Sequence, residues 1–184
     1  MTKEAILKST TWDDYGMGTC PIFIDLFGEV IPFIFLQSCE PKPNISDKMV
    51  ESVNEILSLT KSDRETIKDM LWEECLFSFQ VADYGFEPEE GETHLDAHLR
   101  EFEISNKEDA YSKSVVQEIQ ISQENDGLTG RYLEIIIDSA SDNLINIIVK
   151  NGKIIDFDYN GCNLKTFETD EQHAKKNRQK TLQQ

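Results

Sequence analysis

The stretch that decides the fold runs from residue 143 to residue 159 and reads NLINIIVKNGKIIDFDY. On either side of Asn151-Gly152, apolar side chains recur at every second position, which is the pattern of a strand with one buried face. A type I′ turn needs positive φ at both central residues, and Asn-Gly meets that need well. We therefore predict a β-hairpin with strands at 143–150 and 153–159.

The strand signals extend outward from this hairpin in both directions. Residues 114–122 alternate apolar and polar side chains, and residues 131–138 read RYLEIIID, so the C-terminal half is predicted to form an antiparallel meander. A second hairpin is predicted near the N-terminus, where CPIFIDLF and VIPFIFLQ flank Gly28-Glu29, a two-residue connection typical of a type II′ turn. Because proline donates no hydrogen bond, the nitrogen of Pro32 should face away from its partner strand or mark an edge or bulge.

Two amphipathic helices are predicted in the sequence between these two groups of strands. In residues 46–59 the apolar positions follow helical spacing after Ser46, an N-cap residue. The next helix is predicted to start at Ser62, where Ser62-Asp63-Arg64-Glu65 has the S-x-x-E form of a capping box. Only two residues separate the helices, which favours an antiparallel pair. The predicted fold is α+β, with an antiparallel sheet (N-terminal hairpin plus C-terminal meander) packed against an antiparallel helix pair.

Composition limits the classes of function. The 184 residues include 35 acidic and 18 basic ones, a formal net charge of −17, which excludes a basic nucleic-acid binder because phosphate contacts rest on Lys and Arg. A hydrophobic content of 39% is enough to bury a core. We predict one α+β domain over residues 1–167 and a polar, frayed or disordered tail over residues 168–184.

The compartment expected from the sequence is the cytoplasm. The N-terminal residues lack the apolar run of a signal peptide, and the longest apolar stretches are far shorter than a membrane span. The four cysteines, Cys20, Cys39, Cys75 and Cys162, are scattered and lack C-x-x-C spacing, which favours reduced, buried thiols. No membrane partner and no cofactor is predicted.

Two patterns could bind a metal. Residues 156–161 read DFDYNG and match the opening of a calcium loop, but the position that needs a bidentate glutamate is Phe167, so a strand with outward Asp156 and Asp158 is the favoured interpretation. His94 and His98 are four residues apart in HLDAH, a zinc-binding spacing on a helix. Solvated histidines in an acidic loop are the favoured interpretation there, and we predict no metal site.

Nucleophilic catalysis would have to use Cys20 or Cys75 with the same histidines as bases. No P-loop, G-x-S-x-G or dinucleotide fingerprint occurs, and we predict that the protein is not an enzyme. A small metal- or cysteine-dependent enzyme of unknown substrate stays open as the alternative function.

The acidic residues gather in one segment. Residues 83–109 hold ten acidic residues against two basic ones, a net charge of −8, and periodicity leaves open whether 95–104 is a strand or a short helix. Two interpretations are open: a solubilising loop, or a surface that captures a basic protein. The predicted partner-binding residues are Phe86, Glu87, Glu89, Glu90, Glu92, Asp96, Glu101 and Glu103, with Phe86 as the apolar anchor. A weaker hypothesis is mimicry of nucleic acid by spaced carboxylates.

The order of these features resembles a loosely defined group of small acidic bacterial proteins of unknown function, some of which are immunity proteins of toxin systems. The resemblance rests on EVIPFIF at residues 29–35, EPKP at 40–43, the helix pair, and the meander that closes on NGK at 151–153. The acidic segment is not part of that pattern. The resemblance implies a bacterial cytosolic protein that acts by binding, and together with the charge it predicts an immunity protein that neutralises a cognate basic toxin domain.

Overall fold

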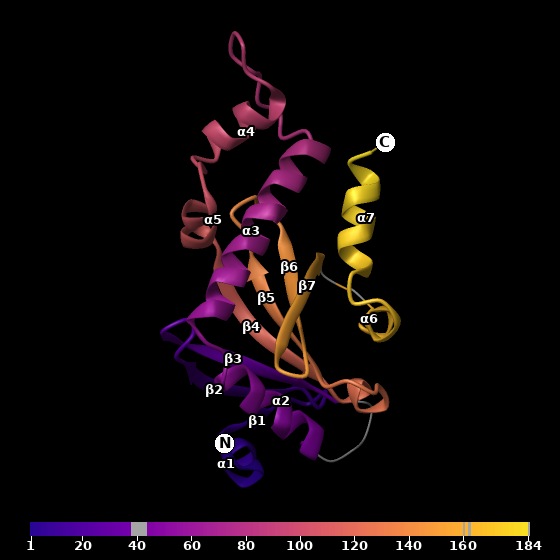
Figure 1. The fold of residues 1–184 in the computed structure, drawn as a ribbon. Coiled ribbons are helices and arrows are strands. Elements are labelled where there is room, and N and C mark those ends of the chain that lie inside the picture. Colours follow the sequence, from indigo (N-terminus) through magenta and orange to yellow (C-terminus); the bar gives the residue numbers. More distant parts are fainter. Residues whose placement is uncertain (38–43, 160, 162, 184) are drawn as a thin grey trace.

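The structure, a computed structural model, describes residues 1–37, 44–159, 161 and 163–183. Figure 1 shows the order of the elements. The strands are β1 (Thr11–Trp12), β2 (Gly18–Ile24), β3 (Glu29–Leu36), β4 (Val115–Ser122), β5 (Tyr132–Asp138), β6 (Leu144–Lys150) and β7 (Lys153–Tyr159). The helices are α1 (Lys3–Ser9), α2 (Asp47–Leu57), α3 (Lys61–Val81), α4 (His94–Glu101), α5 (Lys107–Lys113), α6 (Lys165–Thr169) and α7 (His173–Thr181), with a 3₁₀ turn, η1 (Gln123–Gly127).

The predicted α+β class is confirmed, but the sheet is not purely antiparallel. Its seven strands lie in chain order from β1 to β7, and neighbours are antiparallel except for β3 and β4, which are parallel. The N-terminal hairpin and the C-terminal meander therefore join edge to edge. Pairing of β3 with β4 begins at Phe33, directly after Pro32. Pro32, which has no N–H to donate, therefore lies just outside the part of β3 that pairs with β4.

The two predicted hairpin turns have different outcomes. At the C-terminal turn Asn151 has φ of 50° and Gly152 has φ of 72°, which confirms the type I′ prediction. The two-residue turn predicted at Gly28-Glu29 is wrong, because Ile24 pairs directly with Glu29 and four residues, 25–28, connect the strands. The N–H of Gly28 donates to the carbonyl of Ile24 (2.8 Å), and Gly28, with φ of 76°, closes the longer loop.

The main core lies between one face of the sheet and the helices α2 and α3. It buries apolar side chains from every strand from β2 to β7 and from both helices, among them Phe33, Ile135, Phe157, Val53 and Leu71. The stripe predicted in α2 is confirmed by burial of Met49, Val53 and Ile56, and the Ser46 hydroxyl accepts from the Met49 N–H as its N-cap. Burial of this continuous face is the main stabilising contribution.

The predicted antiparallel helix pair is not what the structure shows. The capping box of α3 is Thr60 with Asp63, two residues before the predicted Ser62 with Glu65. α3 packs mainly on α5, α4 and β7, and Figure 1 shows it running away from α2 toward the far end of the molecule. Both helices bury apolar side chains in the main core without packing as a pair.

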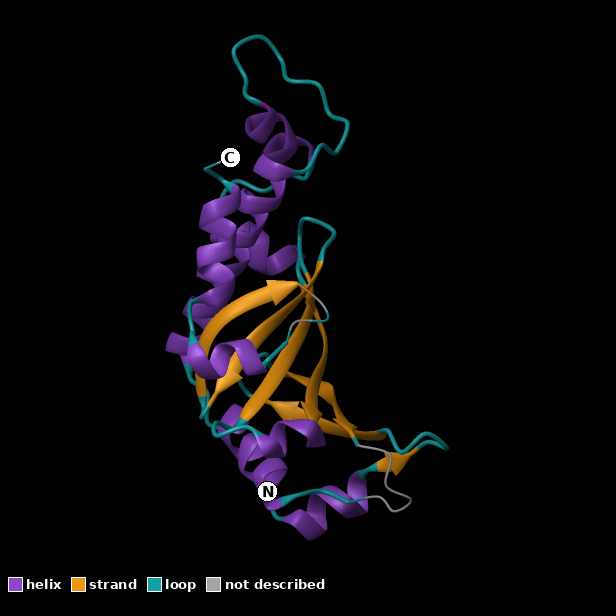
Figure 2. Ribbon diagram, turned by 90° about the vertical axis from the view of Figure 1, so that its right-hand side faces the viewer, coloured by secondary structure: helices purple, strands orange, loops and turns teal. Residues whose placement is uncertain are grey.

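The C-terminal segment is ordered into α6 and α7, whereas the sequence predicted a frayed or disordered tail. Phe167 and Ala174 bury against Tyr132 and Ile148 in a small second core. The molecule is elongated, with the N-terminus near one end and the loop before α4 at the other (Figure 2). Among the described residues, no helix combines the length and apolar content needed to cross a bilayer.

Candidate protein-binding site

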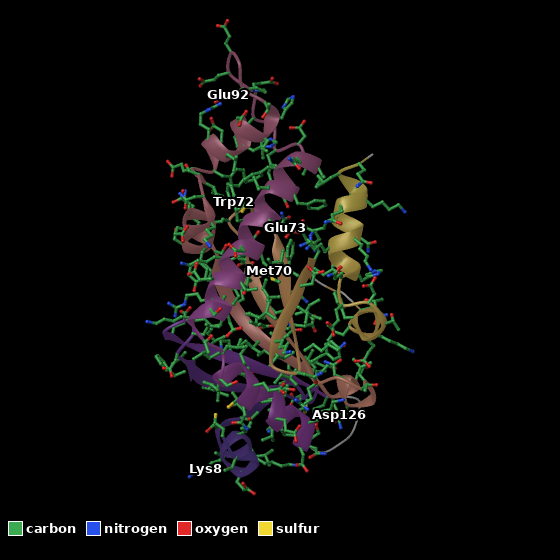
Figure 3. All side chains as sticks on the ribbon, viewed as in Figure 1. Lys8, Met70, Trp72, Glu73, Glu92 and Asp126 are labelled. Atoms are coloured by element: carbon green, nitrogen blue, oxygen red, sulfur yellow. The ribbon has the colours of Figure 1, made fainter. Side chains whose placement is uncertain are left out.

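The predicted binding residues lie together at the far end of the molecule. We call residues 82–103 the acidic tip: a loop that follows α3, then α4, then Phe102 and Glu103. Figure 3 labels Glu92 there, well away from the N-terminal end. The segment that periodicity left undecided, residues 95–104, is therefore helical over most of its length.

The start of α4 uses one of the predicted carboxylates. Asp96 accepts from the N–H (2.9 Å) and the hydroxyl (2.7 Å) of Thr93, while the Asp96 N–H donates to the Thr93 hydroxyl (3.2 Å). The hydroxyl and then the N–H of Thr93 lower the pKa of Asp96. Asp96 is thus a helix cap, and Gly91 and Pro88 fall in the loop before the cap rather than inside the helix.

Arg100 neutralises part of the tip. Its guanidinium donates to both carboxylate oxygens of Glu92, at 3.1 and 3.2 Å, and it also pairs with Glu101 and, at 3.8 Å, with Glu89. The bond from Arg100, followed by the bond from the N–H of Glu89, lowers the pKa of Glu92. Glu92 therefore holds the loop to α4.

Glu87 and Glu90 are the carboxylates that the tip leaves free. Both are exposed, and within the described part of the chain neither has a hydrogen bond or ion pair. Glu103 is also exposed but pairs with Lys113 at 3.2 Å. The uncompensated negative charge of the tip therefore centres on Glu87 and Glu90, beside Glu89.

An aromatic cluster anchors the tip to the end of α3. The ring of Phe86 is half-buried, with its centroid 6.2 Å from that of His98 and 6.0 Å from that of Phe102. Phe79, near the end of α3, contacts Phe102 at 4.8 Å and Tyr84 at 5.4 Å. Edge-on aromatic contacts of this kind stabilise beyond their buried area. The structure thus places Phe86, the predicted anchor for a partner, in the base of the tip.

His98 is a buried structural side chain. It is 1% exposed, its Nδ1 lies 3.0 Å from the carbonyl of Phe79, and its Nε2 accepts from the N–H of Tyr84 at 3.4 Å. The carbonyl accepts and the backbone N–H donates, so this arrangement uses Nδ1 as the donor and Nε2 as the acceptor. The prediction of two solvated histidines is therefore wrong for His98, whereas His94 is exposed.

Sequence reasoning missed a buried polar network beneath the tip. Glu74 is 0% exposed, and its carboxylate accepts from Ser141 (2.7 and 2.8 Å), Ser78 (2.7 Å) and the side-chain amide of Asn143 (3.0 Å). A signal was present, because Glu74 and Ser78 stand seven and eleven residues after Ile67, at positions where the α3 stripe should be apolar.

This network connects α3 to both the tip and the β5–β6 loop. The Tyr84 hydroxyl donates to the carbonyl of Ser141 (3.1 Å) and accepts from Asn143 (3.3 Å). Since Tyr84 also bonds to His98 through its N–H, the base of the loop is fixed on two sides. The free carboxylates thus project from a preorganised base, which lowers the entropy cost of binding.

Asp156, which the calcium-loop-like sequence at 156–161 predicted to point outward, lies instead in a buried ion pair, and Asn160 of that sequence is outside the described residues. Asp156 is 3% exposed and accepts from Arg178 at 2.8 Å and from the backbone N–H of Lys175 at 2.9 Å. Arg178 also donates to the carbonyl of Phe157 (2.6 Å) and stacks over its ring at 3.6 Å. Across the described residues, no group of three or more His, Cys, Asp or Glu side chains is arranged to hold a metal.

Both described thiols are buried and free. Burial raises the pKa of Cys20, and burial together with the neighbouring charge of Glu74 raises the pKa of Cys75 to about 12. A thiol is nucleophilic as the thiolate, so these environments oppose reactivity. Cys39 and Cys162 lie outside the described residues.

Comparison of the chain with family models, with curated proteins and with solved structures finds no match.

Proposed function

We propose that the protein is an immunity protein, which binds and neutralises a cognate basic toxin domain through the acidic tip. The observation that carries the proposal is the pair of free, exposed carboxylates, Glu87 and Glu90, on a base fixed by the aromatic cluster and the Glu74 network. A negative surface steers a positive partner toward itself and disfavours acidic ones.

The mechanism is steric and electrostatic. Glu87 and Glu90 pair with Lys or Arg side chains that line the toxin's active cleft, and the projecting loop blocks access to it. Glu89 assists them, because its side chain stays 72% exposed although it lies 3.8 Å from Arg100. Glu92, Asp96 and Glu101 contribute by shaping the loop, since each already has a partner within the tip. The protein acts in the bacterial cytoplasm, with a protein partner and without a cofactor.

The alternative of a metal- or cysteine-dependent enzyme draws little support from its candidate residues. His98 is committed to two backbone groups, Asp156 is paired with Arg178, and burial raises the pKa values of the Cys20 and Cys75 thiols.

A protection assay tests the proposal, with a basic toxin domain that co-purifies with the wild-type protein as the probe. Cells that express the toxin should survive with the wild-type protein and die with the triple variant Glu87→Lys, Glu89→Lys, Glu90→Lys. The matched control is Glu4→Lys, Asp14→Lys, Glu29→Lys, which reverses the same number of exposed charges near the N-terminal end. Equal protection by the wild type and both triple variants would mean that the acidic tip does not bind the toxin and acts only as a solubilising loop.

A further inference from the structure

The face of the sheet opposite the main core is covered only in part. The helices α6 and α7 pack on it where β5 and β6 carry Tyr132 and Ile148. At the other ends of the same two strands, Asp138 and Leu144 are direct partners, and both are exposed. Figure 2 shows most of the helices to the left of the sheet or below it.

Four exposed apolar side chains lie in a row across this uncovered part. Phe23 of β2 and Val30 of β3 are direct partners. In the next strands, Val115 of β4 is the partner of Asp138, which in turn pairs with Leu144 of β6. The apolar members, in chain order, are 54%, 59%, 55% and 37% exposed. We call the row from Phe23 to Leu144, with Asp138 in it, the open face.

The open face points away from the main core. Its chain neighbours Ile22, Ile31, Val116 and Ile145 pack in that core, and successive side chains of a strand point to opposite faces. Among the described residues, the four apolar side chains of the row belong to neither hydrophobic core. A sheet face that meets water usually carries polar side chains, so a contiguous apolar row at this position marks an interaction surface.

The strands that carry the open face contain no cation. Residues 18–36, 115–122 and 132–148, which cover β2 to β5 and most of β6, include six acidic residues and no lysine or arginine. Glu118 accepts from the side-chain amide of Gln120 (2.6 Å), and Asp138 accepts from that of Gln117 (2.5 Å). Within the described chain, neither carboxylate has a cationic partner. Their negative charge is therefore available to a positively charged partner.

We propose that the open face binds a basic amphipathic helix of another protein. The apolar side of the helix packs on the row, and its Lys or Arg side chains lie beside Glu118 and Asp138, which gives an apolar centre with a charged rim. A second copy of this chain would bring like charges together, which disfavours it as the occupant. The open face lies outside the acidic tip, so the inference does not depend on the proposed toxin partner.

Fluorescence anisotropy with a labelled peptide tests the proposal on the full chain. The peptide has about 18 residues of leucine and lysine, with the leucines at helical spacing on one side. The variant Val30→Lys, Leu144→Lys should raise its dissociation constant by at least about tenfold. The control is Val81→Lys, Leu182→Lys, which adds the same charge at two residues that are 47% and 48% exposed and lie outside the open face, and it should change the constant by less than about threefold.

A second peptide, with the same composition but leucines on all sides, should bind at least about tenfold more weakly. Circular dichroism checks that each variant is folded. Equal binding of the two peptides, or equal losses in the two lysine variants, overturns the proposal. Self-association of the wild type that Val30→Lys, Leu144→Lys abolishes would assign the face to a second copy and also overturns it. If Glu87→Gln, Glu89→Gln, Glu90→Gln alone weakens binding, the peptide binds the acidic tip, which overturns this inference and leaves the proposed function standing.

Discussion

Asp156 in β7 and Glu87 in the acidic tip are both carboxylates of an acidic protein, but their surroundings differ completely. Asp156 is 3% exposed and bound to Arg178 and to a backbone N–H, whereas Glu87 is exposed and lacks a described partner. The interior of the molecule uses its carboxylates to hold elements together, and the tip leaves some of its carboxylates free. Net charge alone does not distinguish these two uses, because burial and partners decide between them.

Removal of Arg178 should give the largest loss of stability. Arg178→Met leaves Asp156 buried without its cation and removes a contact to Glu73 at 3.0 Å. Breaking a buried pair from one side costs about 3–5 kcal/mol, measured as the free energy of unfolding in urea. Lys180→Met, on the same helix but exposed, is the control and should change stability by less than about 0.5 kcal/mol. Similar values for both variants would mean that α7 contributes little to the fold.

The Glu74 network should give the next largest effect. Glu74→Ala removes the buried acceptor that the hydroxyls of Ser78 and Ser141 and the amide of Asn143 share, which costs about 1–3 kcal/mol. Since Tyr84 joins this network to the tip, amide hydrogen exchange in residues 82–93 should also become faster. A stability loss with unchanged exchange in the tip would show that the network does not support the tip.

Glu168 should make a smaller, pH-dependent contribution. The N–H groups of Gly130 and Thr129 donate to its carboxylate at 3.0 and 2.9 Å, and the bond from Gly130 is the main reason that its pKa falls from 4.5 to about 2. A folded-state pKa below the unfolded one stabilises the fold above about pH 4.5, and this contribution disappears as the pH falls toward 2. The difference in unfolding midpoint between wild type and Glu168→Gln should therefore shrink across that range. A difference that stays constant with pH would contradict the assignment.

The features that could be predicted from the sequence depend on short-range rules. Asn151-Gly152 fixes its turn, Ser46 caps α2, and alternation marks β4, because neighbouring residues determine each of them. The parallel pairing of Phe33 with Ile119 joins residues far apart in the chain, and no local pattern encodes it. The packing of the C-terminal segment was not predictable for the same reason. Arg178 holds α7 in place by pairing with Asp156 and Glu73, which are distant from it in the sequence.

In the candidate site, too, features set by neighbouring residues were predictable and features set by distant contacts were not. The clustering of the acidic residues could be predicted, because they are close together in the sequence. The separation of Glu92 and Asp96 from the free Glu87 and Glu90 was not predictable, because it depends on how the loop folds back onto Arg100. Burial of His98 depends likewise on packing against Phe79.

Association kinetics with the cognate toxin domain test the central claim, that the free carboxylates of the tip bind a basic partner. The variant Glu87→Lys, Glu89→Lys, Glu90→Lys should keep the wild-type melting temperature and lose at least about tenfold in association rate constant. The charge-matched variant Glu4→Lys, Asp14→Lys, Glu29→Lys should retain most of the wild-type rate. Equal rate constants for the two triple variants would contradict the account, because the position of the charge on the molecule would then make no difference.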